Sequence, residues 1–402
     1  MSALSWYCCP TKIHMGAGAH EKIEAVVRGF GCTRLFVAVD EALLRSALFE
    51  RVQALLQRCN VRSEVFTGIE PDPSAHTVER AFEVARAMDA QAVLAIGGGS
   101  TMDVAKAVAI LATNGGRIHD YEGIDKFQQR PLPRIAVPTT AGTGSEVSGS
   151  CVITDTEKNL KMSIRHAQFN PADVAILDPL AVSTVPAHVA AHSGLDAFVH
   201  ALESYVSLQA NPVTDALNLH AIELLSANLR PFVAQRANAD AALAMLCGST
   251  LAGMTFGITG LGNVHCMARF VGTRLHLSHG LSNALCLPTV ARFNLAAAPA
   301  RFARVAQAMG CHVQGLPELE AARAAVRLSS IAPYRPITPR YRNSRISSVV
   351  RRGSQSHQVP HIGRPQIEPV ASVITVNAAP IGAQAIARIS QSLMRQTSAI
   401  AA

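Results

Sequence analysis

Residues 92–106 read AVLAIGGGSTMDVAK and combine a strand, a glycine turn and the start of a helix. The apolar run at residues 92–96 has the length of a buried strand, and a helical pattern follows the turn. N–H groups at a helix N-terminus attract anions, and glycine lets the backbone approach a ligand closely. We consider two interpretations of Gly97, Gly98 and Gly99: a pyrophosphate site, or a tight turn without a ligand. Ser100 or Thr101 is predicted to cap the helix.

Similar strand candidates alternate with helical patterns through the first half of the chain. The predicted strands are Leu35–Val39, Ala92–Ile96, Arg134–Pro138 and Val174–Leu177, and the predicted helices include Ala42–Arg58 and Thr77–Met88. This alternation is typical of βαβ units, which build a mostly parallel sheet.

Beyond Pro186, helical periodicity replaces the strand-like runs, as in His192–Val206 and Thr214–Val233. The pattern therefore predicts an α/β domain at residues 1–183 and an all-α domain at residues 184–325.

A second loop (the hydroxyl loop, residues 139–146) also follows a predicted strand. Its hydroxyl side chains belong to Thr139, Thr140, Thr143 and Ser145. Open α/β sheets bind ligands at the C-terminal ends of their strands, so we expect both loops to border one site. Asp40 ends another predicted strand, where its carboxylate either accepts hydrogen bonds from a ribose or caps the helix that follows.

Four side chains in the second half of the chain have the chemistry of metal ligands. They are Asp196, His200, His265 and His279. The first two are four residues apart and therefore share a helix face. The last two are 14 residues apart, roughly 21 Å along one helix, so sharing a metal requires a break, which Gly272 or Gly280 allows. One carboxylate with three imidazoles suits Fe²⁺ or Zn²⁺. The alternative for each histidine is a hydrogen-bonded core residue.

Together these motifs resemble the iron-containing (group III) alcohol dehydrogenases. The resemblance covers residues from about 12 to 310, and its motifs are the glycine turn with Asp103 and Lys106, the hydroxyl loop, Gly194–Ser207 and the stretch from His265 to Pro288. It implies a dinucleotide-binding α/β domain and an all-α metal-binding domain, an architecture like that of dehydroquinate synthase. It also implies an NAD-dependent oxidoreductase that transfers a hydride between a small primary alcohol or aldehyde and NAD, with Fe²⁺ or Zn²⁺ as the metal.

The resemblance further assigns residues to the site. The implied metal ligands are Asp196, His200, His265 and His279. The implied cofactor contacts are Asp40, Gly97, Gly98, Gly99, Ser100, Asp103, Thr139, Thr140, Thr143, Ser145 and Lys161, with Asp40 favouring NAD over NADP. The expected catalytic residues are His279 and Arg269.

Three departures from the family pattern leave alternatives open. Arg269 stands where the family has a second histidine near the substrate, and a guanidinium there can bind a carboxylate, so an ω-hydroxy acid or semialdehyde is the alternative substrate. Ile258 replaces a common asparagine, and the chain lacks the family's acidic helical end. The rival functions are a metal-dependent lyase or synthase of the same fold, a catalytically impaired product, and a basic binding protein.

The net charge of +8 is confined to the last fifth of the chain. Residues 326–402 contain ten Arg, no Lys or Asp, and Glu368 as their one acid, which leaves the preceding residues at −1. This tail is interpreted as a poorly ordered basic appendage or as the product of a slipped reading frame, which would impair the enzyme. Few aromatic side chains accompany its arginines, so no nucleic-acid partner is predicted.

The remaining composition predicts where the protein resides. Nine cysteines without a CxxC pair indicate reduced thiols and a cytoplasmic protein. The apolar runs are too short to span a bilayer, so no membrane partner is predicted. The expected partners are a small alcohol or aldehyde and, from the resemblance, further copies of the chain in a homodimer or higher homo-oligomer.

Overall fold

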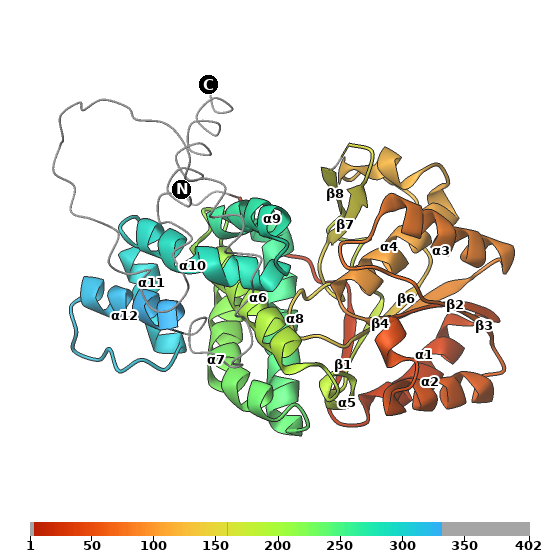
Figure 1. The fold of residues 1–402 in the computed structure, drawn as a ribbon, viewed down its shortest axis with the longest axis horizontal. Coiled ribbons are helices and arrows are strands. Elements are labelled where there is room, and N and C mark those ends of the chain that lie inside the picture. The colour runs from red at the N-terminus through yellow and green to blue at the C-terminus, as the bar shows by residue number, and fades with distance from the viewer. Residues whose placement is uncertain (1–3, 159, 332–402) are drawn as a thin grey trace, which may run out of the picture. The chain divides into compact units, whose positions relative to one another are not determined.

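A six-stranded parallel sheet forms the centre of the N-terminal half of the protein, in a computed structural model that describes residues 4–158 and 160–331 (Figure 1). Its strands in spatial order are β1 (Lys12–Met15), β9 (Val174–Leu177), β6 (Arg134–Pro138), β4 (Ala92–Gly97), β2 (Arg34–Val39) and β3 (Arg62–Phe66). Each neighbouring pair is parallel. The predicted α/β class and all four predicted strands are confirmed.

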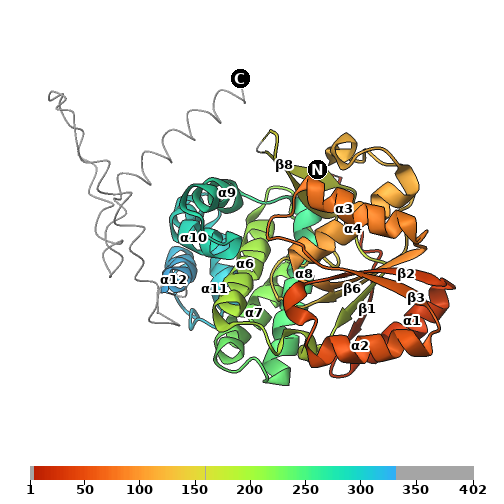
Figure 2. The same cartoon turned by 45° about the vertical axis from the view of Figure 1, so that its right-hand side comes forward.

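Helices cover both faces of this sheet (Figure 2). They are α1 (Lys22–Phe30), α2 (Ala47–Arg58), α3 (Ala75–Ala87) and α4 (Gly99–Asn114). Successive side chains of a strand point to opposite faces, and in β2 Leu35 and Val37 join the core with α1 and α2, while Phe36 and Ala38 join the core with α3 and α4. Burial on both faces explains why the central strands are continuous apolar runs.

A smaller sheet lies beside the main one and carries strands that the sequence patterns did not predict. It consists of β5 (Gly123–Ile124), β8 (Leu160–Arg165) and β7 (Ser150–Asp155), with β7 and β8 antiparallel. Short 3-10 helices complete this half, namely η1 (Ala19–Glu21), η2 (Glu41–Leu43) and η3 (Ile118–Tyr121).

The rest of the described chain is helical, which confirms the predicted all-α half. Its helices are α5 (Pro179–Val182), α6 (Ala187–Val206), α7 (Pro212–Ala234), α8 (Ala239–Thr259), α9 (Asn263–Leu275), α10 (His279–Leu295), α11 (Pro299–Ala308) and α12 (Glu318–Ile331). α6 lies at the centre of this half and is buried from Gly194 to Tyr205. Both halves belong to one unit, Met1–Arg335, and the domain bounds at residues 183 and 325 stay predictions.

The structure interrupts one predicted helix. Ala42–Arg58 was expected to be continuous, but η2 ends at Leu43 and α2 begins only at Ala47. Ser46 adopts an extended conformation, and its hydroxyl accepts a hydrogen bond from the Phe49 N–H at 3.2 Å. This side-chain cap favours a new helix start over continuation.

The C-terminal tail is described only at its beginning. α12 continues to Ile331, past the boundary predicted at residue 325. Both interpretations of the tail, a poorly ordered appendage and a slipped reading frame, concern residues 326–402, and from residue 332 onward these lie outside the described part of the chain.

Among the described residues one helix, α8, is long and apolar enough to cross a membrane. However, 61% of its most apolar window is buried inside the protein. This burial is typical of a core helix, and α8 packs against α6 and α7.

Candidate metal centre and cofactor loops

Three helices bring the predicted metal ligands together. Asp196 and His200 lie one turn apart on α6, His265 lies in the first turn of α9, and His279 begins α10. The Asp196 Oδ1 is 3.8 Å from the His265 Nε2 and 3.7 Å from the His279 Nε2. One ligand atom from each of these three residues lies within 4.8 Å of the others, which is the spacing of a shared metal ion.

The helix break between the two late histidines occurs at a residue that we did not predict. α9 ends at Leu275, and its C-cap His276 adopts a left-handed conformation with φ of 53°, whereas Gly272 lies inside α9 and Gly280 inside α10. Gly280 serves close packing instead, because a Cβ there would lie 2.0 Å from the carbonyl oxygen of His192 on α6. The required break is therefore confirmed, but neither Gly272 nor Gly280, the two residues expected to allow it, lies at the break.

His200, the fourth predicted ligand, lies beside this group of three and is not part of it. Its ring stacks between Phe256 and His265, with 4.5 Å between ring centroids on each side. Its Nδ1 is buried without a hydrogen-bond partner and lies 3.8 Å from the Asp196 Oδ2. Burial lowers the pKa of His200 to about 4, so the ring is neutral and has a lone pair for a cation. An unpartnered buried nitrogen beside a carboxylate fits a metal ligand, and a metal would satisfy both groups.

Two further side chains surround these ligands, and sequence reasoning singled out neither. Asn283 is fully buried, and its Nδ2 donates to the Asp196 Oδ1 at 2.6 Å while lying 3.1 Å from the His265 Nε2. Glu203 accepts a hydrogen bond from the His265 Nδ1 at 2.7 Å. Burial raises the pKa of Glu203, but hydrogen bonds from His265 and from backbone N–H groups outweigh it and lower the pKa. Glu203 follows His200 by three residues and Asn283 follows His279 by four, so each shares a helix face with a ligand, and this spacing was the signal in the sequence that could have identified them.

The glycine turn packs directly against the hydroxyl loop. A Cβ on Gly99 would lie 2.7 Å from the Thr143 side chain, and one on Gly98 would lie 3.2 Å from the Thr140 hydroxyl. Gly98 is the N-cap of α4 and no side chain caps the helix, so the prediction that Ser100 or Thr101 does so is wrong. Both residues lie inside α4, whose first N–H groups therefore have no side-chain cap.

A buried network joins α4 to the hydroxyl loop. The Ser145 hydroxyl donates to the Asp103 Oδ1 at 2.9 Å and accepts from the Lys106 Nζ at 2.9 Å. The Lys106 Nζ also donates to the carbonyl oxygen of Ser150 at 2.6 Å, and the Asp103 Oδ2 accepts from the Val152 N–H at 3.0 Å. Asp103 and Ser145 thus use their side chains within the protein, and their expected cofactor contacts stay predictions.

Three other expected cofactor contacts, Asp40, Thr139 and Lys161, lie on or next to different elements of the α/β half. The Asp40 carboxylate accepts a hydrogen bond from the Ala42 N–H at 3.1 Å, so the structure shows the capping alternative, and a ribose contact stays a prediction. Thr139 is buried at the end of β6. Lys161 lies on β8, where its Nζ is 2.6 Å from the Asp72 Oδ1.

Arg269 lies one helical turn after His265 on α9 and is exposed. Its Nη2 donates to the carbonyl oxygen of Lys161 at 3.3 Å, so this side chain links α9 to β8. No described carboxylate forms an ion pair with it. Its charge therefore stays available to an anionic group.

The hydroxyl loop also contacts the helix that carries the metal ligands. A Cβ on Gly142 would lie 2.7 Å from the Ser193 Cβ, and Ser193 precedes Asp196 by one turn of α6. The loop expected to bind the cofactor and the candidate metal centre are therefore neighbours.

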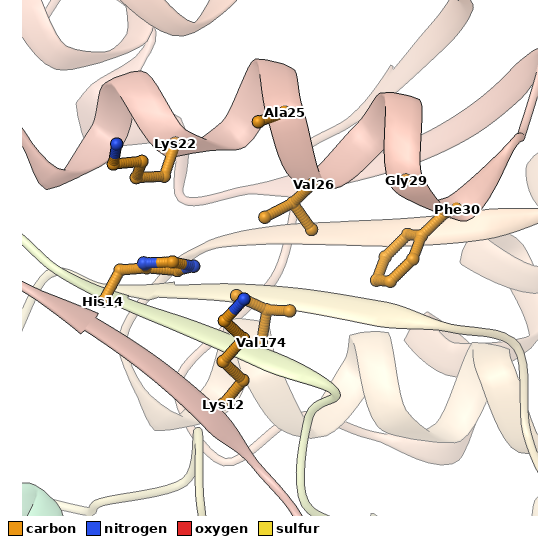
Figure 3. Close-up of a pocket in the computed structure, with 8 residues that line it drawn as sticks. All are labelled: Lys12, His14, Lys22, Ala25, Val26, Gly29, Phe30 and Val174. Atoms are coloured by element: carbon orange, nitrogen blue, oxygen red, sulfur yellow. The ribbon is translucent and has the colours of Figure 1, made fainter.

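A pocket of about 330 Å³ lies apart from this site, between α1 and the edge of the sheet at β1 and β9 (Figure 3). Its basic side chains are Lys12, His14 and Lys22, and Val26, Phe30 and Val174 form an apolar wall. Burial and the two lysines lower the pKa of His14. None of the predicted site residues lines this pocket.

Comparisons with known proteins agree with this geometry. Residues 10–179 match the family described as iron-containing alcohol dehydrogenase, and residues 190–333 match the C-terminal region of the Fe-containing alcohol dehydrogenase family. The chain is 36% identical to an NAD-dependent methanol dehydrogenase of Bacillus methanolicus, over 78% of this chain and 82% of the relative. It is 37% identical to a 1,3-propanediol dehydrogenase of Klebsiella pneumoniae, over 80% and 83%.

Solved structures show the same likeness. A 1,3-propanediol oxidoreductase matches with a TM-score of 0.80 and 36% identity, over 83% of this chain and 88% of that one. A sulfoacetaldehyde reductase from Bifidobacterium kashiwanohense in complex with NAD+ matches with a TM-score of 0.75 and 28% identity, over 88% and 93%.

Proposed function

The chain belongs to the iron-containing alcohol dehydrogenase family, and on that premise we propose that it transfers a hydride between a small primary alcohol or aldehyde and NAD. The observation that carries the proposal is the convergence of Asp196, His265 and His279 from three helices, with the unpartnered nitrogen of His200 beside them. These four residues would hold a divalent metal, Fe²⁺ or Zn²⁺.

The chemistry divides between the bound groups and the protein. A bound metal supplies a Lewis acid that stabilises negative charge on the substrate oxygen, and NAD supplies the hydride acceptor. The protein supplies position: the glycine turn and the hydroxyl loop would hold the cofactor next to α6, and neutral imidazoles of α6, α9 and α10 would hold the metal. A guanidinium has donors and no acceptor, so Arg269 can donate hydrogen bonds and takes no proton from the alcohol.

Replacement of His265 by alanine tests the metal assignment. We expect His265→Ala to lose its metal, measured by elemental analysis, and its NAD reduction with a panel of alcohols in the presence of Fe²⁺. A variant that kept full activity would refute the ligand assignment. The same panel separates a dehydrogenase from a lyase of the same fold, and a wild-type protein that folds and binds metal but reduces no NAD would support an impaired product.

A second candidate is an aldehyde or alcohol that carries an anionic group. Arg269 favours it, because its guanidinium is exposed one turn from His265 and no described carboxylate pairs with it. A sulfoacetaldehyde reductase of Bilophila wadsworthia is 35% identical over 73% of this chain, and the substrate in its name is anionic. We therefore propose an ω-hydroxy acid or semialdehyde as the alternative substrate class.

Comparison of butanol with 4-hydroxybutyrate decides between the two substrate classes. If Arg269 binds the anion, Arg269→Met should lower kcat/KM for 4-hydroxybutyrate by about 10- to 100-fold, the value of a charge-assisted hydrogen bond, and leave butanol unchanged. A clear preference of the wild-type protein for butanol would exclude the anionic substrate. The cytoplasmic location and the homo-oligomer stay proposals, the latter to be tested by light scattering.

A further inference from the structure

We propose that Glu203 is a positioning residue of the metal centre, which fixes the proton of the His265 ring on Nδ1 and ties the start of α9 to α6. The inference rests on the proposed metal-dependent function, because His265 is a metal ligand only if that function is correct. Glu203 lies on α6, in the turn that follows His200, and 4% of it is exposed.

The Glu203 carboxylate accepts four hydrogen bonds from the beginning of α9. Its Oε2 accepts from the His265 Nδ1 at 2.7 Å, from the Gly262 N–H at 3.0 Å and from the His265 N–H at 3.3 Å. Its Oε1 accepts from the Val264 N–H at 2.7 Å. An ionised carboxylate only accepts hydrogen bonds, so all four partners must be donors.

This requirement determines the tautomer of His265. The ring nitrogen that faces the carboxylate, Nδ1, must carry the proton, and the Nε2 then keeps its lone pair. That lone pair is on the side of the metal centre, where the Nε2 lies 3.8 Å from the Asp196 Oδ1 and 3.1 Å from the Asn283 Nδ2. A carboxylate that orients a histidine in this way raises metal affinity, because the ring is already in its binding form.

The same carboxylate anchors the helix on which His265 lies. The first N–H groups of a helix have no partners within it, and Gly262, the N-cap of α9, has no side chain to provide one. Glu203 supplies the missing acceptor from α6, and its negative charge suits the helix N-terminus. A Cβ on Gly262 would lie 2.7 Å from the Glu203 Oε1, so glycine is needed for this approach.

Substitution of Glu203 by glutamine separates the two roles. Glutamine has one oxygen, so its amide nitrogen must replace either Oε1, which faces the Val264 N–H, or Oε2, which faces the His265 Nδ1. At Oε2 the amide nitrogen is a donor that favours a His265 ring with the proton on Nε2, and at either place the negative charge that holds the Nδ1 proton is lost. We expect Glu203→Gln to bind Zn²⁺ about 10- to 100-fold more weakly in a competition with a chelating dye, with a smaller change in the urea midpoint of the metal-free protein than Glu203→Ala. Glu203→Asp should recover part of the affinity.

A matched control exists on α7. Glu223 lies 3.3 Å from the His220 Nδ1, but both side chains are exposed and distant in sequence from the ligands. Glu223→Gln should leave Zn²⁺ affinity and NAD reduction unchanged. Equal Zn²⁺ affinity of folded Glu203→Gln and wild-type protein would overturn the proposal, since a purely structural role changes stability alone.

The tautomer itself gives a second readout that needs neither metal nor a substitution of Glu203. In ¹⁵N spectra of the metal-free wild-type protein, with His265→Ala used for assignment, we expect a protonated Nδ1 and an unprotonated Nε2 on His265. The opposite tautomer would overturn the proposal. A wild-type protein that binds no metal yet shows the expected tautomer would count against the proposed function and leave the positioning of His265 standing.

Discussion

Replacement of Gly144 by alanine tests how the hydroxyl loop is held against the helical half. Gly144 has a φ of +57°, in the left-handed region that side chains rarely adopt. A Cβ there would lie 2.6 Å from the Gly253 Cα and 2.8 Å from the Ser249 carbonyl oxygen, both backbone atoms of α8. Backbone atoms cannot rotate away as a side chain can, so the loop itself must move.

Two costs add at this position. The left-handed conformation costs an alanine about 1–2 kcal/mol, and overpacking costs about 1–3 kcal/mol. Gly144→Ala should therefore lower the free energy of unfolding by about 2–5 kcal/mol. The loop also carries Thr143 and Ser145, so we expect the folded fraction of Gly144→Ala to bind NADH more weakly than the wild type.

Three other glycines separate the two costs. Gly31 has a φ of +64° with no atom within 4 Å of an added Cβ, so Gly31→Ala should lose about 1–2 kcal/mol from conformation alone. Gly253→Ala, 2.6 Å from the Gly144 carbonyl oxygen, adds overpacking without a positive φ. Gly257, one turn later in α8, has its nearest neighbour at 3.4 Å, so Gly257→Ala should gain up to about 1 kcal/mol of helix propensity.

Urea unfolding followed by far-UV circular dichroism measures these differences, and fluorescence titration measures NADH affinity. The reasoning requires Gly144→Ala to lose more stability than Gly31→Ala. If the two variants are equally stable, the contact between the hydroxyl loop and α8 contributes nothing and our account of the loop is wrong.

Three further predictions concern the network, the metal centre and pH. Lys106→Met should cost about 3–5 kcal/mol in urea unfolding, because the Asp103 carboxylate 3.9 Å away loses its buried counter-charge; a cost below about 1 kcal/mol would contradict this. Asn283→Ala removes a donor to a ligand carboxylate and should weaken Zn²⁺ binding about 10-fold, whereas unchanged affinity would exclude that role. Burial raises the pKa of Glu70, but hydrogen bonds from Thr77 and Ser74 outweigh it and lower the pKa to about 2. Because the pKa is lower in the folded protein, ionised Glu70 stabilises the fold above pH 4.5, and this stabilisation is lost as the pH falls toward 2. The free energy of unfolding of Glu70→Gln should therefore change less steeply between pH 4.5 and 2 than that of the wild type.

Local periodicity was sufficient for the central strands and for the division into an α/β half and a helical half. The central strands are buried on both faces and therefore stand out as apolar runs, whereas β3 contains Arg62 and Glu64 at the sheet edge and escaped prediction. The start of α2 was misplaced because the Ser46 hydroxyl caps a new helix that begins at Ala47. Short side-chain hydrogen bonds of this kind leave the hydrophobic period unchanged.

The candidate ligands followed from residue chemistry and family motifs, but their assembly did not. The helix break at His276 depends on a left-handed residue that no spacing rule identifies, and Gly280 is needed because α10 approaches the His192 carbonyl oxygen. The partners Glu203 and Asn283 likewise become visible only when α6, α9 and α10 are packed together.

The amino-acid sequence was enough for the α/β half with its central strands, for the helical half and for the residue types of the metal centre, because periodicity and ligand chemistry are properties of short stretches. Tertiary structure decided which nitrogen of His265 faces the centre, which acids and amides orient the ligands, and that Asp103 and Ser145 bond to each other. These features depend on contacts between segments about 40 to 90 residues apart, and such contacts exist only when the chain is folded.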